Sequence, residues 1–571
     1  MTYKYYTNRA EHLTKEFLIE EYRKLTDRVQ AAEASETSEL WLKLYADWNA
    51  LSAYGGGEGS RLSYALAKNM ESAASEEAFR YFREEVIPIA DNAESELVDA
   101  LHKSKYVAAI GERYGKHLIE VQAAMRESIA PINNELRVKA GDLSNKYDKI
   151  VSQAEVMVGG KKVTATVARN MTTGEADPKV REEAYRAHYG WFLEHRQEIA
   201  SIYGDIVKLR DEMGRNLGHK NFIPLGYASM RRTDYGPKEV KTFREAIRKY
   251  VVPLQTKLYE MQAEELGTAT LRPWDSGYSP SLNLPTGIAP VATQLDNAQK
   301  VFEALSPRLA AHFTRMRKEG LIDLENRKGK QAGAFCTSFS DEGRVAILCN
   351  STGDEVDVTT LIHEMGHAFQ AWESQVIEAV DLQWPTSDAA DVHSMGMEYL
   401  SLPEMTKFYS QENADKVQKH RWKSAVHMMC YIAIVDEFQH WVYENPNCTL
   451  EERDAAWSSI WDIYQPGIDF TGLEQHKFAR WYMQGHLFST PFYYIDYAIA
   501  ETGAMQLALM GEADRTKALD TYLKLCQMGG KESVLTIFKS AGLRSPFEPE
   551  VLRNLMEHAA KKLQVEEYEL T

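Results

Sequence analysis

Apolar residues recur at every third or fourth position along most of the chain, which is the spacing of one face of an α-helix. The pattern is clearest over Glu16–Ala34, Ser75–Tyr106 and Val240–Leu266, which are also rich in residues of high helix propensity. The glycine-rich stretch Ser52–Ser60 and the Pro/Gly/Ser-rich stretch Leu271–Pro290 interrupt it, so we expect a flexible loop and a long irregular connection there. The sequence therefore predicts a mainly α-helical protein.

One zone has a β pattern instead. Gly333–Ser340 and Arg344–Asn350 are short runs of β-branched and aromatic residues, and Asp341–Gly343 between them has the composition of a turn. We therefore expect one small sheet, followed by a helix whose N-cap is Asp357. A further break in the helical pattern lies at Val158–Lys162.

Composition and charge narrow the class of protein. The 571 residues include 66 Lys and Arg against 83 Asp and Glu, a formal net charge of −17 at pH 7. Binding of nucleic acid needs clustered positive charge, and no apolar stretch is long enough to span a membrane. Five scattered cysteines form no disulfide framework, and the first residues lack the apolar segment of a signal peptide. We expect a cytoplasmic protein with neither a nucleic-acid nor a membrane partner.

The helix predicted after the strand pair contains His363-Glu364-Met365-Gly366-His367. Residues four apart share a helix face, so His363 and His367 can bind one Zn²⁺ ion. Glu364 lies beside them, where it can hold a metal-bound water and take its proton. The position of the motif, at a helix start directly after two strands, favours a metal site over two unrelated histidines.

A catalytic zinc site needs a third protein ligand, and the helix predicted over residues 387–402 offers Asp391, His393 and Glu398. Asp391 and Glu398 are on the same face but about 10 Å apart along the axis, so one straight helix cannot offer both as ligands. His393 points away from Asp391. We expect one carboxylate to bind the metal and the other to orient a ligand histidine or line the cleft. The spacing leaves open which does which.

Residues 481–497 form a second cluster, in which His486 is followed by Tyr493, Tyr494 and Tyr497. Tyr494 and Tyr497 are three residues apart and share a helix face. Phenol hydroxyls and an imidazole N–H can stabilise the oxyanion that forms when water attacks a peptide carbonyl. Tyrosine-rich apolar helices also occur as plain core elements, and the pattern by itself leaves that alternative open.

Taken in order, these segments resemble the thimet oligopeptidase family of zinc metallopeptidases, and most closely its bacterial oligoendopeptidase F-type branch. The resemblance spans roughly residues 226–497. Besides the histidine motif, the matching stretches are Arg327–Phe339, Asp391–Glu398 and Gly485–Tyr497, with Arg232–Gly236 and Pro273–Asp275 as further landmarks.

The resemblance implies a two-lobed, mainly α fold with a deep channel for short unstructured peptides and one small β-sheet beside the active-site helix. We expect an N-terminal helical lobe (residues 1–205) and a catalytic zinc-peptidase lobe (residues 206–571), with lobes that are discontinuous in sequence. One Zn²⁺ per chain is the implied cofactor, bound by His363, His367 and Asp391, with Glu364 as the general base.

The resemblance also implies how substrate is held. His486, Tyr494 and Tyr497 bind the peptide backbone and stabilise the tetrahedral intermediate, and Tyr493 is a further substrate contact. The segment Gly333, Ala334 and Phe335 pairs with the bound peptide as an added β-strand.

The chain departs from the family pattern in two places. The family usually has Glu where Asp391 stands, and the aspartate is shorter by about 1.5 Å, so Asp391 and Glu398 both stay open as the third ligand. The tyrosine spacing after His486 is compressed, which leaves open which phenol contacts substrate. We predict a zinc-dependent oligoendopeptidase. The alternatives are a carboxypeptidase or peptidyl-dipeptidase with the same chemistry, and a peptide-binding protein with a degraded metal site; the oligomeric state is not predicted.

Overall fold

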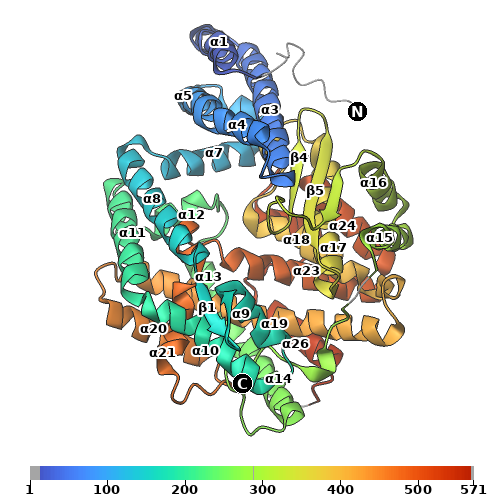
Figure 1. The fold of residues 1–571 in the computed structure, drawn as a ribbon. Helices are drawn as coiled ribbons and strands as arrows, with labels where there is room; N and C mark the ends of the chain where they lie inside the picture. The colour runs from blue at the N-terminus through green and yellow to red at the C-terminus, as the bar shows by residue number, and fades with distance from the viewer. Residues whose placement is uncertain (1–12, 287–288, 567–571) are drawn as a thin grey trace. The chain divides into compact units, whose positions relative to one another are not determined.

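The computed structural model describes residues 13–286 and 289–566, which form two compact units. Unit 1 comprises residues 13–126, 284–414 and 503–543, and unit 2 comprises residues 127–283, 415–502 and 544–566. Each unit is mainly helical, as the sequence predicts (Figure 1). The lobe boundary predicted between residues 205 and 206 is a different division of the chain and stays a prediction.

Unit 1 contains helices from all three of its chain segments. Its helices are α1 (Lys15–Thr26), α2 (Val29–Ala34), α3 (Glu39–Lys68), α4 (Ala73–Tyr81), α5 (Ile87–Lys103), α6 (Val107–Tyr114), α15 (Val291–Leu305), α16 (Pro307–Lys318), α17 (Glu355–Glu373), α18 (Ser387–Ser401), α24 (Arg515–Met528) and α25 (Val534–Ser540). Three further helices contribute residues to both units: α7 (Lys116–Ser128), α19 (Gln411–Glu444) and α23 (Ile495–Ala513).

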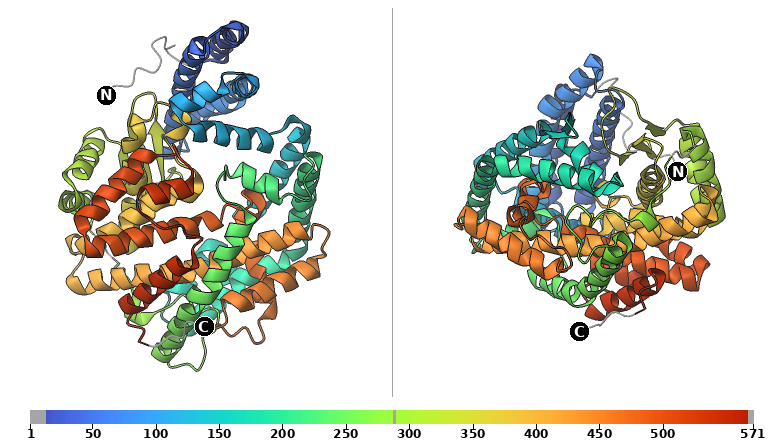
Figure 2. Two further views of the ribbon diagram at one scale, coloured as in Figure 1. Left: turned by 180° about the vertical axis from the view of Figure 1, so that it is seen from behind. Right: turned by 60° about the horizontal axis from the view of Figure 1, so that its bottom comes forward.

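The predicted hairpin is confirmed and gains a third strand. β4 (Phe335–Phe339) pairs antiparallel with β5 (Arg344–Ser351), with Phe335 opposite Leu348, and β3 (Ile322–Glu325) pairs parallel with β5. The strand order is β3-β5-β4, so β4 lies at an edge of the sheet. Helix α17 packs against β5 and β4, and α18 and α24 pack against α17 (Figures 1 and 2). The sheet therefore supports the helix that carries the histidine motif.

The prediction of a flexible loop at Ser52–Ser60 is wrong, because this stretch lies inside α3. A Cβ on Gly57 would meet Oδ1 of Asp341 at 1.9 Å, and one on Gly59 would meet the ring of Phe82 at 2.6 Å. The glycines thus provide room for close packing rather than chain flexibility. Neighbouring Arg61 pairs with Asp341 at 2.7 Å and fixes the β4–β5 turn on α3.

Unit 2 is built from helices and one small hairpin. Its helices are α8 (Asn134–Ser152), α9 (Ala165–Gly174), α10 (Pro178–Glu194), α11 (Arg196–Asn216), α12 (Ile223–Ser229), α13 (Pro237–Ala246), α14 (Val252–Leu266), α20 (Leu450–Tyr464), α21 (Glu474–Tyr482), α22 (Gly485–Ser489) and α26 (Pro549–Lys562). The break predicted at Val158–Lys162 is the turn between β1 (Glu155–Val158) and β2 (Lys161–Thr164), a second sheet that the sequence pattern did not indicate.

Two long helical patterns contain π-helical turns. η1 (Phe82–Val86) separates α4 from α5, and η3 (Ile247–Val251) separates α13 from α14. In each case the second residue of the following helix is proline, Pro88 or Pro253, which has no N–H to donate. The wider turn before each proline lets the helical direction continue.

The connection predicted over Leu271–Pro290 is largely irregular, and its only helical turn among the described residues is η4 (Pro280–Leu282). Residues 287–288 lie outside the described part of the chain. So do the N-terminal residues 1–12, on which the expectation about a signal peptide rests. Within the described part, no helix combines the length and the apolar character that crossing a membrane requires.

Candidate metal centre and substrate-binding residues

The start of α17 is fixed by a capping box, one turn earlier than predicted. Asp354 is the N-cap, and Asp357 is the third helical residue rather than the N-cap. Oδ2 of Asp357 accepts hydrogen bonds from the backbone N–H groups of Thr352, Gly353 and Asp354 at 2.9, 2.6 and 3.2 Å. A carboxylate three residues into the helix can reach back to the donors that precede it, which sets the direction in which α17 leaves the sheet.

The structure brings His363, His367 and Asp391 together. Oδ1 of Asp391, on α18, lies 3.6 Å from Nε2 of His363 and 3.4 Å from Nε2 of His367. One ligand atom from each of the three residues lies within 4.8 Å of the others. Ligands about 2.0–2.1 Å from a tetrahedral zinc ion are separated by about 3.3 Å. The donor set and its spacing therefore fit a zinc ion, with a fourth position left to other groups.

Glu398 contacts the opposite side of the first histidine. Its Oε1 lies 2.6 Å from Nδ1 of His363, so the Nδ1–H donates to this carboxylate and Nε2 faces Asp391. Burial by itself lowers the pKa of His363, but the hydrogen bonds and charges of Asp391 and Glu398 outweigh burial and raise it to about 10. The two histidines in turn hold the pKa of Asp391 well below its usual range, against the effect of burial.

A glycine inside the motif explains how the short aspartate reaches the histidines. A Cβ on Gly366 would lie 2.5 Å from Cα of Ser394 and 2.6 Å from the carbonyl oxygen of His393. The backbones of α17 and α18 thus approach more closely than any side chain at this position would allow. Ser394 also donates a 3.1 Å hydrogen bond to Oδ1 of Asp391. The closer approach offsets the missing methylene of the aspartate.

Glu364 is 7 % exposed, and no described side chain or backbone group donates a hydrogen bond to its carboxylate. Burial raises its pKa, although His363 and His367 oppose the shift. Burial, and after it the Glu364 charge, raises the pKa of the Cys336 thiol on β4, so the carboxylate lies within electrostatic range of the edge strand. A buried carboxylate of raised pKa without fixed donors is suited to accept and release a proton.

The predicted peptide-pairing segment lies at the start of the edge strand. Phe335 is the first residue of β4, whereas Gly333 and Ala334 precede the strand. Gly333 has φ +89° and its carbonyl oxygen accepts a 2.8 Å hydrogen bond from Asn350. Because β4 pairs only with β5 among the described strands, its other edge is available for a further strand.

His486 and the three tyrosines form a second cluster, within unit 2. The ring centroid of His486 lies 5.8, 4.8 and 6.3 Å from those of Tyr493, Tyr494 and Tyr497. Burial raises the pKa of Tyr494 to about 12, and burial lowers that of His486. At neutral pH the phenol is therefore protonated and the imidazole is neutral.

Gln484 selects the tautomer of the imidazole. Tyr431 donates a 2.9 Å hydrogen bond to Oε1 of Gln484, so the amide nitrogen faces Nδ1 of His486 at 2.8 Å. Since the amide nitrogen can only donate, the proton of the neutral imidazole is on Nε2. Sequence reasoning missed Gln484 and Tyr431, although Gln484 stands only two residues before His486.

Buried arginines hold the backbone of this cluster. Arg210 donates to the carbonyl oxygens of Leu487 and Phe488 at 3.0 and 2.5 Å. Arg232 donates to the carbonyl oxygen of Phe492 and pairs with Asp496, at 2.5 and 2.6 Å. Phe492 has φ +65°, an unusual conformation for an aromatic residue, and these contacts stabilise it.

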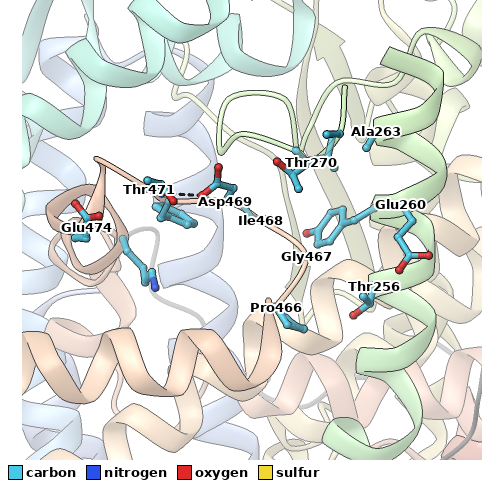
Figure 3. A pocket seen from close by; sticks show the side chains of 15 residues that line it. Thr256, Glu260, Ala263, Thr270, Pro466, Gly467, Ile468, Asp469, Thr471 and Glu474 are labelled. Carbon is cyan, nitrogen blue, oxygen red and sulfur yellow. Dashed lines mark hydrogen bonds between the residues drawn. The ribbon is translucent and has the colours of Figure 1, made fainter. Parts of the chain in front are cut away.

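A cavity of about 680 Å³ lies elsewhere in unit 2, beside α14 and the segment after α20 (Figure 3). Its polar lining includes Glu260, Asp469 and Glu474, and the backbone N–H of Thr471 donates to Oδ1 of Asp469 at 2.8 Å. None of the residues predicted as site residues lines it. The candidate chemistry therefore resides in the two clusters described above rather than in this cavity.

Comparisons with known proteins show the family of this chain. The profile of peptidase family M3 matches residues 171–557. PZ peptidase A, solved with an inhibitor, is 30 % identical, with a TM-score of 0.87 over 98 % of this chain and 99 % of its own. A proposed oligoendopeptidase F from Bacillus anthracis str. Ames is 28 % identical, with a TM-score of 0.82 over 99 % of this chain and 98 % of its own.

A curated relative is more distant. The oligoendopeptidase F homolog of Borreliella burgdorferi (strain ATCC 35210 / DSM 4680 / CIP 102532 / B31) is 21 % identical over 382 residues. The match covers 64 % of this chain and 62 % of that relative's length. The family profile covers well over half of the chain, and the solved structures match it nearly end to end. The chain therefore belongs to peptidase family M3, and it is similar to the oligoendopeptidase F proteins of that family.

Proposed function

We propose that this protein is a zinc-dependent oligoendopeptidase that hydrolyses internal peptide bonds of short unstructured peptides. The observation that carries the proposal is the cluster of His363, His367 and Asp391 with Glu364 beside it on the same helix. A purely structural metal site would have no use for a buried, unbonded carboxylate next to two ligand histidines.

His363, His367 and Asp391 would hold one zinc ion, and Glu398 would orient His363 through its Nδ1–H. When bound, zinc supplies a Lewis acid that polarises the scissile carbonyl and makes water a better nucleophile at neutral pH. Asp391, whose Oδ1 lies between both histidines, is proposed as the third ligand, and Glu398 as the supporting carboxylate.

Glu364 would act as the general base. Its carboxylate takes a proton from the attacking water and passes it to the nitrogen of the leaving amine. The raised pKa of Glu364 supports this role, because a carboxyl group closer to neutrality both accepts and returns a proton more readily.

The remaining predicted residues would position the peptide. The open edge of β4, beginning at Phe335, would pair with the substrate backbone, together with Gly333 and Ala334 just before it. The protonated phenols of Tyr494 and Tyr497 and the Nε2–H of His486 would donate to the oxyanion, with Tyr493 as a substrate contact. That this cluster and the metal cluster act on one bound peptide is part of the proposal.

The test is cleavage of an internally quenched nonapeptide blocked at both ends. We expect cleavage that a chelator abolishes and added zinc restores. Glu364→Gln should lower kcat by about 100-fold or more, the usual contribution of a general base, while the variant retains one zinc ion. Glu77→Gln, which changes an exposed glutamate on α4, is the matched control and should keep the activity.

Blocked ends also distinguish the alternatives. An exopeptidase such as a carboxypeptidase or peptidyl-dipeptidase leaves the blocked peptide intact and cleaves the unblocked one. Binding without cleavage of either peptide by the zinc-loaded wild type would indicate a peptide-binding protein. Wild-type kcat in Glu364→Gln would contradict the proposed base. A cytoplasmic location stays a prediction from the sequence.

A further inference from the structure

Unit 2 contains an arginine that is surrounded by aromatic rings instead of carboxylates. Arg480, on α21, is partly buried, and its guanidinium lies 4.6 Å from the ring centroid of Trp461, 5.0 Å from that of Tyr189 and 5.9 Å from that of Tyr185. In the described part of the chain, no carboxylate lies within ion-pair distance of it, and its buried Nε has no hydrogen-bond partner. Helices α21 and α10 form this contact (Figure 1).

The titratable groups around Arg480 are neutral or positive. The charge of Arg480 acts on Tyr185, His188, Tyr259 and Tyr431, which come from α10, α14 and α19. The pKa of His188 is lowered to about 4, first by burial and then by the nearby arginines Arg169 and Arg480. None of these groups offers a counter-charge at neutral pH.

A second arginine adds to the positive potential. Arg169, on α9, is exposed, and it forms no ion pair within the described residues. Its charge acts on His188, Tyr431 and Tyr494. The charges of Arg169 and Arg480 thus both act on His188 and Tyr431, and neither arginine pairs with an acidic residue within the described residues. This is unexpected in a chain of net charge −17.

A guanidinium away from bulk water is costly when no carboxylate balances its charge, and ring faces replace only part of its hydration. Proteins usually pair such a group with a carboxylate, for which the planar fork of arginine is well matched. An arginine in this setting, with neutral tyrosines as neighbours and no carboxylate partner among the described residues, has the properties of a receptor for an anionic ligand.

Arg480 lies near the cluster proposed to bind substrate. The ring of Tyr431 lies 6.4 Å from that of Trp461 and 6.0 Å from that of Tyr494, and its hydroxyl bonds to Gln484, the partner of His486. Tyr431 thus contacts both the arginine's aromatic surroundings and the His486 cluster, all within unit 2.

We infer that Arg480, assisted by Arg169, binds a carboxylate of the peptide substrate, either its C-terminal α-carboxylate or an acidic side chain. The inference rests on the proposed function, because it takes the ligand to be a peptide. It assigns Arg480 to substrate selection, not to the chemical step.

The test uses the zinc-loaded Glu364→Gln protein and four fluorescent, N-acetylated heptapeptides of one neutral sequence. One pair differs in a free or amidated C-terminus; the other pair is amidated and carries Glu or Gln at a central position. We expect the carboxylate member of at least one pair to bind on the order of tenfold tighter, the size of a charge-assisted hydrogen bond. The pair that shows the preference identifies which carboxylate is bound.

Arg480→Met in the same background keeps an unbranched apolar side chain and removes the guanidinium with its charge. It should reduce the preference to within about twofold, and Arg248→Gln, which removes an exposed arginine of unit 2, should leave it unchanged. A merely structural Arg480 would weaken all four peptides equally, and that result would overturn the inference. Arg169→Gln, at an exposed position, supplies a second variant if Arg480→Met does not fold, and it should reduce the preference in part.

Equal binding of both members of each pair by Glu364→Gln itself would also overturn the inference, without any change at Arg480. Failure of the proposed function has a different signature. In that case the wild type would show no chelator-sensitive cleavage of any peptide, whatever its carboxylates.

Discussion

Replacing Gly366 by alanine tests whether the close approach of α17 and α18 creates the metal site. The added Cβ would lie 2.5 Å from Cα of Ser394 and 2.6 Å from the carbonyl oxygen of His393. Both are backbone atoms, so no side-chain rotation relieves the overlap, and the two helices must separate at this crossing. Ordinary contact begins at 3.4 Å, so the required separation is about 0.9 Å.

This shift is large for a metal site. Oδ1 of Asp391 now lies 3.6 and 3.4 Å from Nε2 of His363 and His367, close to the tetrahedral spacing of about 3.3 Å. Moving α18 away lengthens both distances to about 4 Å or more, beyond what one zinc ion can bridge. Because Asp391 is the proposed third ligand, we expect zinc affinity to fall by about 100-fold or more, the upper end of the range for supporting groups. Overpacking should also cost about 1–3 kcal/mol of stability.

The assay is zinc affinity by competition with a chelating dye, with thermal unfolding of the metal-free protein measured in parallel. Gly366→Ala combined with Asp391→Glu should recover most of the affinity, because the glutamate is longer by about 1.5 Å, more than the helices must separate. Gly56→Ala is the control, since a Cβ at that position in α3 meets nothing within 4 Å. The reasoning is refuted if Gly366→Ala binds zinc as tightly as the wild type, or if the longer carboxylate gives no recovery.

Four further predictions concern the same unit. The pKa of His363 is raised to about 10 in the metal-free protein, so its Nε2 proton must leave when zinc binds. Calorimetry at pH 7.5 in two buffers of different ionisation enthalpy should therefore find about one proton released per zinc ion. Zinc binding without proton release would contradict this prediction. In that protein the stabilisation from His363 is present below pH 6.5 and should be lost as the pH rises towards 10. Glu398→Gln removes the negative charge of the group that accepts from Nδ1 of His363, and it should weaken zinc binding about 10- to 100-fold. An unchanged zinc affinity in the dye competition would argue against Glu398 as the carboxylate that orients His363. Gly57→Ala places a Cβ 1.9 Å from Asp341 and should lower the free energy of unfolding by about 1–3 kcal/mol in urea titrations. A higher free energy of unfolding would contradict this, because it would mean that the β4–β5 turn with Asp341 moves aside without cost.

Much of the fold follows from local patterns of apolar, β-branched and turn-forming residues in the sequence. The strand pair before α17 was predicted because β-branched residues and a turn signal occur within a few positions. The spacing of His363 and His367 predicts a shared helix face, since i and i+4 are neighbours on any helix. The N-cap of α17 was misplaced because Asp354 and Asp357 both have N-cap chemistry. The hairpin of unit 2 was missed because its strands are only four residues long.

Other features depend on contacts between residues far apart in the chain. Ser52–Ser60 has the composition of a loop, but packing of α3 against Phe82 and Asp341 makes its glycines favourable inside a helix. The sequence could not reveal Arg480 as a candidate subsite, because its interest comes from the absence of an acidic partner, which only tertiary neighbours define.

The sequence by itself determined which functional groups are present and how they are spaced. These are two histidines at helical spacing, a carboxylate between them and two carboxylates seven residues apart on a later helix. The tertiary structure decided how these groups are arranged. It brings Asp391 against both Nε2 atoms and Glu398 against Nδ1 of His363, a distinction that spacing left open. The physical reason is that local periodicity fixes which face a side chain occupies, whereas the separation of two packed helices, set here by Gly366, fixes what that side chain can reach.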